Sequence, residues 1–149
     1  MMRVLLINGP NLNKLGTRKP EVYGTTTLEQ VILKVRNHAS ARGATLVDFQ
    51  SNHEGAIIDW LQEMAGGADG IVINPGGLAH YSVALRDALE DTNLPVVEIH
   101  ISDPATREDF RHRFVTATAA AATVTGKGWR GYLEAVDRLA EIVERSRKQ

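Results

Sequence analysis

The sequence predicts an α/β protein whose five-stranded parallel sheet is doubly wound, with helices on both faces. Short apolar and β-branched runs alternate along the chain with longer segments of helical periodicity, as in repeated strand–helix units. Most of the runs are apolar throughout, which is typical of strands buried on both faces of a parallel sheet. Polar clusters also follow four of the runs directly, where open α/β sheets bind their ligands. Together these features indicate a flavodoxin-like fold.

The strands and helices are expected in strict alternation. The strands are predicted at residues 4–7, 45–49, 70–73, 96–99 and, more weakly, 117–125. The helices are predicted at residues 28–41, 54–65, 82–91, 105–114 and 132–147. The 149 residues contain no internal repeat and no linker, so residues 1–149 are expected to form one domain, a catalytic one on the chemistry below.

Composition and charge exclude several classes of function. A formal net charge of -1 gives no electrostatic footprint for nucleic acid, and no basic run indicates a membrane surface. The lack of cysteine excludes disulfides, thiolate metal sites and a cysteine nucleophile, and it fits a cytoplasmic location. The apolar run at residues 4–7 is far too short for a signal sequence or a membrane span. We therefore expect a soluble protein whose partner is a small molecule or another copy of the chain.

Four polar clusters are expected to meet at the carboxyl edge of the sheet, because each follows a strand. They occupy residues 8–12, 50–52, 74–77 and 98–102. The third, Asn74-Pro75-Gly76-Gly77 followed by His80 and Ser82, is either a plain tight turn or a helix N-terminus suited to hydroxyls or anions. The sequence contains neither a Walker pattern nor a dinucleotide fingerprint, which argues against a nucleotide ligand.

His100 differs from the other four histidines because it ends an expected strand, two residues after Glu98. Residues i and i+2 of a strand share a face, so the Glu98 carboxylate is placed to orient the imidazole and to hold its proton. A core histidine without a functional role fits the same pattern. No two histidines have the spacing of a helical metal site, so no metal is expected.

Two further segments carry positive charge. The first loop, residues 8–24, is far longer than the roughly two to six residues usual after such a strand. It carries Arg18 and Tyr23, and it is either a lid or a disordered excursion. In the second segment, Asp103 is expected to cap a helix that begins at Pro104. That helix would present its arginines either to an anion or simply to water.

Taken together, these clusters make the chain resemble the type II dehydroquinases. The matching motifs run in order over nearly the whole chain, and several motifs in register are far more specific than any one alone. They are Asn8-Gly9-Pro10-Asn11-Leu12, Leu15-Gly16 with Arg18 and Pro20, Tyr23-Gly24, Gln50-Ser51-Asn52 with Glu54-Gly55, Asn74-Pro75-Gly76-Gly77 with His80 and Ser82, Val83-Ala84-Leu85-Arg86-Asp87-Ala88, residues 98–102, Arg107-Glu108 with Phe110-Arg111, and Gly131-Tyr132.

The resemblance implies a lyase that needs no cofactor. It would remove water from 3-dehydroquinate by anti elimination through an enolate, giving 3-dehydroshikimate. This reaction serves the shikimate pathway of aromatic amino acid biosynthesis or the breakdown of quinate, and the sequence does not separate the two. The resemblance also implies a homo-oligomer built from trimers, a dodecamer.

The resemblance further implies a role for each matching residue. Tyr23 would take a C2 proton, with Arg18 beside it on the lid to favour the phenolate. His100, oriented by Glu98, would give a proton to the departing C1 hydroxyl. The other implied roles are enolate stabilisation through a water for Asn11, contacts with ring hydroxyls for Asn74, His80 and Arg111, contacts with the carboxylate for the amides of Ile101 and Ser102, and entry from a neighbouring subunit for Asp87.

The chain departs from the family pattern at Asp103-Pro104, where an Asn is usual, and at His112-Arg113-Phe114. The Asp103 charge near a carboxylate site needs a partner, for which Arg107 is the candidate. Residues 125–129 replace a more apolar glycine loop. Two other functions remain open at this point: a flavodoxin-like module that binds a small hydroxy acid without converting it, and a receiver-like regulatory domain. The second would be expected to have an acidic pocket after the first strand, where this chain has Asn8-Gly9.

Overall fold

The computed structural model describes residues 1–149 as one parallel five-stranded sheet with the order β2-β1-β3-β4-β5. The strands are β1 (Met2–Asn8), β2 (Ala44–Gln50), β3 (Gly70–Asn74), β4 (Val96–His100) and β5 (Ala122–Thr125). The main helices are α2 (Leu28–Ala41), α3 (Glu54–Met64), α4 (Val83–Asp91) and α5 (Gly131–Arg147), and a single turn, α1 (Pro20–Tyr23), lies in the first long loop. The α/β doubly wound prediction is confirmed.

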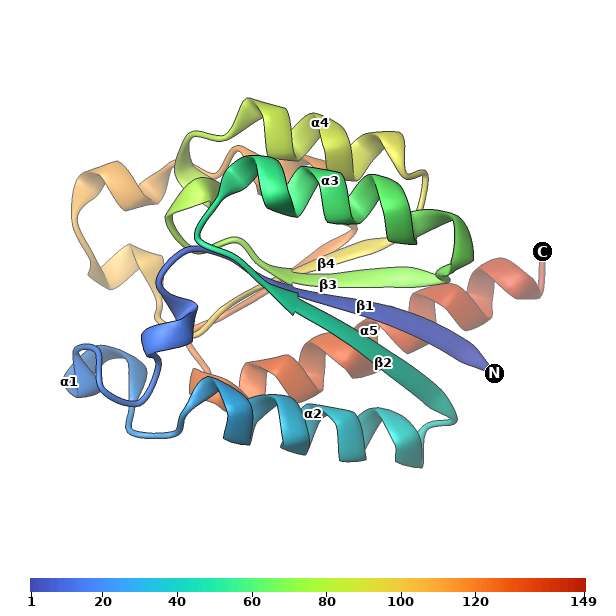
Figure 1. The fold of residues 1–149 in the computed structure, drawn as a ribbon, viewed down its shortest axis with the longest axis horizontal. Helices are drawn as coiled ribbons and strands as arrows, with labels where there is room; N and C mark the ends of the chain where they lie inside the picture. The colour runs from blue at the N-terminus through green and yellow to red at the C-terminus, as the bar shows by residue number, and fades with distance from the viewer.

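Helices cover both faces of the sheet (Figure 1). Helices α3 and α4 pack on one face, and α2 and α5 pack on the other. The side chains of β1, β3 and β4 are almost entirely buried on both sides, as their apolar sequences predict. The carboxyl ends of the strands, the loop with α1 and the segment that follows β4 all lie at one end of the molecule (Figure 1).

Local sequence explains where the helices begin. Thr27 and Gln30 form a capping box at the start of α2, because each side chain bonds the backbone amide of the other residue. Ser82 caps α4 by accepting a bond from the Leu85 amide at 3.0 Å. Buried residues recur at helical spacing along α5 from Tyr132 to Val143, so this helix packs its apolar side against one face of the sheet.

The predicted helix at residues 105–114 is wrong. Asp103 does cap a turn that begins at Pro104, but this turn is a 3-10 helix that ends at Thr106. Arg107 and Glu108 are extended, and a second 3-10 turn, Asp109–His112, follows. The chain leaves the helical path here because the Arg107 side chain turns inward to hydrogen-bond Tyr23 and Ser102. Tertiary contacts override helical propensity at this point.

The predicted strand at residues 117–125 is correct only in its last four residues, which form β5. Residues Thr116–Ala119 form a 3-10 turn instead. The Thr118 hydroxyl donates to the Val115 carbonyl at 2.7 Å and competes with extended pairing. The Thr116 side chain is fully buried against β4. No helix of the structure is long and apolar enough to cross a membrane.

Candidate active site

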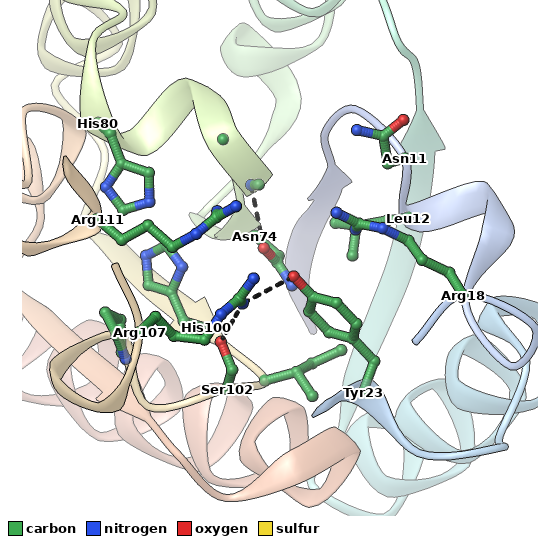
Figure 2. A pocket seen from close by; sticks show the side chains of 14 residues that line it. Asn11, Leu12, Arg18, Tyr23, Asn74, His80, His100, Ser102, Arg107 and Arg111 are labelled. Carbon is green, nitrogen blue, oxygen red and sulfur yellow. Dashed lines mark hydrogen bonds between the residues drawn. The ribbon is translucent and has the colours of Figure 1, made fainter. Parts of the chain in front are cut away.

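A pocket of about 180 Å³ opens at the carboxyl ends of the strands, where the fold class predicts a ligand (Figure 2). Its wall is mostly polar. The lining residues are Asn11, Leu12, Arg18, Tyr23, Asn74, Gly76, Gly77, His80, His100, Ile101, Ser102, Pro104, Arg107 and Arg111. Three of them are arginines, and none is an aspartate or a glutamate, so the pocket suits a small anion.

Close backbone contacts build the floor of the pocket. The Gly9 amide donates to the Asn74 carbonyl at 2.8 Å, which joins the loop after β1 to the last residue of β3. A Cβ atom at residue 9 would lie 2.4 Å from the Pro75 carbonyl oxygen, so only glycine fits there. Gly76 has a positive φ of 60°, which glycine adopts without strain. These glycines belong to the turn motifs that the sequence places at the site.

A buried hydrogen-bond chain holds Asn74 in place. Its Nδ2 donates to the Tyr132 hydroxyl at 2.9 Å, and that hydroxyl donates to Asn8 Oδ1 at 2.6 Å. The Asn74 Oδ1 accepts from the Gly76 amide at 3.1 Å. Burial raises the pKa of Tyr132 well above its usual value, against the weaker effect of its bond with Asn74, so this hydroxyl stays protonated. One N–H of Asn74 remains for a ligand.

His100 and Glu98 form the pair that the sequence predicts. The imidazole Nε2 lies 2.7 Å from Glu98 Oε2, and the carboxylate is completely buried. An ionised carboxylate only accepts hydrogen bonds, so Nε2 carries a proton and Nδ1 is the nitrogen left to donate or accept in the pocket. With Nε2 protonated, the ring can act as an acid in the pocket when Nδ1 carries a proton as well.

In His80 a hydrogen bond fixes the other ring nitrogen, Nδ1. Its Nδ1 donates to the Arg113 carbonyl at 2.7 Å, which leaves Nε2 as an acceptor in the neutral ring. The Phe114 ring packs edge-on against both histidines, with its centroid 5.4 Å from each imidazole centroid. His80 is therefore suited to receive a hydroxyl proton from a ligand, whereas His100 is suited to give one.

Tyr23 reaches the pocket from the last residue of α1 (Figure 2). Its hydroxyl oxygen accepts a hydrogen bond from Arg107 at 2.9 Å, and Arg107 also donates to the Ser102 hydroxyl at 3.2 Å. Arg18 lies over the ring face instead, with its guanidinium carbon 4.6 Å from the ring centroid. Two cations therefore lie against this phenol, and Arg107 contacts its oxygen directly.

Two further contacts hold residues at the rim of the pocket, one at Asn11 and one at Arg111. The Asn52 side chain accepts from the Asn11 backbone amide at 2.9 Å, which holds Asn11 in a left-handed conformation at the pocket edge. Arg111 pairs with the Glu108 carboxylate at 3.2 Å. A hydrogen bond from its own backbone amide, followed by the bond from Arg111, lowers the pKa of Glu108 below its usual value. No group of three or more His, Asp or Glu side chains is arranged to hold a metal ion.

Comparison with known proteins decides the family. The family model described as "Dehydroquinase class II" matches residues 2–140. The 3-dehydroquinate dehydratase of Roseiflexus castenholzii is 52% identical over 138 residues, covering 93% of this chain and 88% of that protein. The catabolic 3-dehydroquinase of Aspergillus clavatus is 53% identical over 137 residues, covering 92% of this chain and 91% of that protein.

The chain belongs to the class II dehydroquinases.

The crystal structure of the type II dehydroquinase from Butyrivibrio crossotus superposes with a TM-score of 0.91 at 44% identity, covering 93% of this chain and 97% of that one. The fold of the present chain brings nearly all of the predicted site residues together. Nine of them line one pocket, and Glu98 lies directly behind His100. The nine are Asn11, Arg18, Tyr23, Asn74, His80, His100, Ile101, Ser102 and Arg111.

Asp87 is the predicted residue that the structure places elsewhere. It lies on α4, outside the pocket lining, where it pairs with Arg86 at 3.0 Å and its side chain is 57% exposed. The helical spacing that separates it from His80 predicts this distance from its own site. Asp87 therefore reaches a substrate only if another subunit brings a site to it.

The sequence reasoning undervalued Arg107. We expected this residue to balance the Asp103 charge, but it pairs instead with the Tyr23 hydroxyl and with Glu108, at 3.6 Å from its carboxylate. Asp103 caps its own turn and accepts from the Ala105 amide at 3.0 Å. The available signal was the matching Arg107-Glu108 motif, but the assumed helix placed this side chain on a surface.

Proposed function

We propose that this chain catalyses the dehydration of 3-dehydroquinate to 3-dehydroshikimate, acting as a hydro-lyase. One observation carries the proposal: a single cationic pocket contains a phenol bonded to a guanidinium and an imidazole backed by a buried carboxylate. These two groups supply the base and the acid of an elimination reaction. The family and the names of its most similar relatives point to the same reaction.

Substrate binding follows from the polarity of the pocket. The carboxylate of the substrate would lie near Ile101 and Ser102, in the positive field of Arg107. Its ring hydroxyls would contact His80 Nε2, the free N–H of Asn74 and the Arg111 guanidinium. Arg111 retains donors for this purpose, because its pairing with Glu108 uses Nε.

The first chemical step would remove a proton next to the ketone. Phenol is a poor base at neutral pH, so Tyr23 acts as a phenolate that Arg107 stabilises through its hydrogen bond and Arg18 through the ring face. The phenolate oxygen takes the C2 proton, and the C–H electron pair becomes the enolate. Negative charge then develops on the former carbonyl oxygen, where Asn11 is placed to stabilise it through a water.

The second step would expel the C1 hydroxyl. The enolate electrons form the new double bond as the C1–O bond breaks, and His100 Nδ1 gives its proton to the departing oxygen, so that water leaves. Tyr23 then holds one additional proton and His100 one fewer, and exchange with solvent restores both. No net electrons are transferred to or from the substrate, and Tyr23, His100 and Asn11 supply the base, the acid and the stabilisation of the enolate, so we propose that turnover needs neither a metal nor an organic cofactor.

The proposal is tested by incubating the purified chain with 3-dehydroquinate and following the ultraviolet absorbance of the conjugated enone product. We expect the absorbance to rise, and to rise equally after dialysis of the protein against a chelator. In a separate experiment, borohydride added together with the substrate should trap no lysine adduct. Substrate binding by calorimetry without any enone would instead support a hydroxy-acid binding module. Relatives named as dehydratases and relatives named as catabolic enzymes match this chain equally well. Growth on quinate by a deletion strain therefore tests a catabolic role.

We also propose a closed homo-oligomer built from trimers, a dodecamer, in which Asp87 completes the site of a neighbouring subunit. Asp87 lies outside the lining of its own pocket, and three large apolar side chains close in sequence to site residues are more than half exposed. These are Tyr81, Val83 and Phe110, at 68%, 55% and 64% exposure. Exposed apolar side chains that gather near one site are typical of a protein interface.

Subunit mixing tests this arrangement. Asp87→Ala and Tyr23→Phe should each be impaired, and co-refolded mixtures should recover a fraction of the activity, because some sites then take Tyr23 from one chain and Asp87 from another. Monomeric light scattering, or no recovery in subunits that demonstrably exchange, contradicts the arrangement. The single catalytic domain and the cytoplasmic location stay predictions, which limited proteolysis and cell fractionation test.

A further inference from the structure

The carboxylate behind His100 has a second partner. Glu98 Oε2 contacts the imidazole Nε2 at 2.7 Å, and Oε1 accepts a hydrogen bond from the Thr116 hydroxyl. Glu98 and Thr116 are both completely buried, and His100 is 7% exposed. Thr116 is not among the residues that line the pocket, so it does not touch a substrate there. The three side chains form a buried relay that ends at the pocket.

The chemistry of a buried carboxylate gives Thr116 a definite task. An ionised carboxylate without hydrogen-bond donors is costly in a protein interior, so each oxygen needs a partner. Thr116 satisfies Oε1 and turns the carboxylate so that Oε2 meets the imidazole. Without the hydroxyl, the carboxylate is less restrained in rotation, and its two oxygens compete for the single Nε2–H donor. The direction of His100 Nδ1 toward the substrate then becomes less well defined.

The segment that carries Thr116 also contacts both histidines. Phe114, two residues earlier, packs against the rings of His80 and His100. Two residues later, the Thr118 hydroxyl receives a bond from Arg86 at 2.9 Å, which ties the same turn to α4. The 3-10 turn Thr116–Ala119, whose last three residues were predicted to be extended, therefore brings the Thr116 hydroxyl to Glu98.

We propose that Thr116 is a positioning residue for the acid step, which acts on the departing hydroxyl through Glu98 and His100 without touching the substrate. The inference rests on the proposed dehydration. It separates the two chemical steps: Thr116 lies on the side of the acid, whereas the base, Tyr23, is held from a different segment by Arg107 and Arg18. Loss of the hydroxyl should slow expulsion of the C1 hydroxyl and spare removal of the C2 proton.

Two substitutions isolate the hydroxyl. Thr116→Val keeps the shape and removes the donor, and Thr116→Ser keeps the donor and removes a methyl group. We expect Thr116→Val to form enone roughly 10- to 100-fold more slowly, the range typical when an outer partner that orients functional side chains is removed. In deuterated solvent, its C2 exchange should stay within about twofold of the wild type, and its KM should change little. Thr116→Ser should restore enone formation, and Thr118→Val is the matched control on the same turn.

A double-mutant cycle distinguishes positioning from general damage. If Thr116 acts through His100, Thr116→Val should have no further effect on the rate in a His100→Ala background. Independent, multiplying losses would overturn the proposal, and so would an equal loss of C2 exchange and enone formation in Thr116→Val alone. If Thr116→Val does not fold, Thr116→Cys replaces it, because the S–H of cysteine is only a weak donor. Its rate of enone formation should lie below the rates of the wild type and Thr116→Ser and above the rate of His100→Ala. A wild-type rate for Thr116→Cys would then refute the role. A wild-type chain that forms no enone refutes the proposed function itself.

Discussion

Tyr132→Phe is the substitution whose effect on the free energy of unfolding the structure defines most closely. The ring is fully buried, so phenylalanine keeps the packing and removes one oxygen. That oxygen accepts from Asn74 and donates to Asn8. The Asn8 Nδ2 already has no hydrogen-bond partner, so losing the bond at Oδ1 leaves the whole amide unsatisfied. Each buried group left without its partner costs about 1–3 kcal/mol.

Asn74 can turn its freed N–H toward the pocket, whereas Asn8 is completely buried, so one buried group loses its partner. We therefore expect Tyr132→Phe to lower the free energy of unfolding by about 1–3 kcal/mol, a sizeable share of the roughly 5–15 kcal/mol typical of a domain. Urea denaturation of the two proteins at neutral pH measures this difference. The KM should also rise, because Asn74 loses its orientation. A loss of less than about 0.5 kcal/mol would refute the account of this hydrogen-bond chain.

The same substitution makes a prediction about pH. Burial raises the pKa of Tyr132 above that of a tyrosine in the unfolded chain, which is about 10. The stabilisation by its hydroxyl is therefore complete below pH 10 and is lost above it, because the unfolded chain ionises while the folded chain does not. The difference between wild type and Tyr132→Phe should be constant from pH 6 to about 9, and it should shrink by up to about 1.4 kcal/mol per pH unit above about 10. A difference that grows with pH would contradict this reasoning.

Four further substitutions test the site. Arg107→Ala should lower kcat more than Arg18→Ala does, by about tenfold or more, because Arg107 bonds the Tyr23 oxygen whereas Arg18 contacts only the ring face; equal losses would contradict this ranking. His100→Ala should slow enone formation roughly 10²–10⁴-fold and leave C2 exchange measurable, and equal suppression of both would argue against a separate acid step. Asn52→Ala frees the Asn11 amide and should lower kcat/KM several-fold without unfolding the protein, as steady-state kinetics and circular dichroism can show.

The fold was predictable because its strands are buried on both faces. Continuous apolar runs and helical periodicity identified β1, β3, β4 and α2 correctly, since packing and propensity agree in these segments. The polar clusters likewise predicted the pocket, because parallel strands end at the same edge of a sheet. In the first long loop, residues 8–24, loop length left order and disorder open, and the structure shows an α-helical turn that ends at Tyr23.

The segment after β4 could not be predicted from local sequence, because long-range contacts determine it. Arg107 is drawn inward by Tyr23, which lies 84 residues earlier, and Thr116 by Glu98, which lies 18 residues earlier. Both contacts break regular structure: one ends a predicted helix, and the other replaces part of a predicted strand. The residues that bend the chain toward the site are Arg107, whose role the sequence analysis undervalued, and Thr116, which it did not single out.

The central claim is that Tyr23 and the cations around it remove a proton in this pocket. The most direct test follows enone absorbance from 3-dehydroquinate for the wild type and for Tyr23→Phe side by side, with circular dichroism to show that both are folded. Tyr23 is only partly buried, so the variant should fold normally. We expect the wild type to form enone, and Tyr23→Phe to lose roughly 10²–10⁴-fold in rate together with C2 exchange. Enone formation by Tyr23→Phe at the wild-type rate would contradict the account.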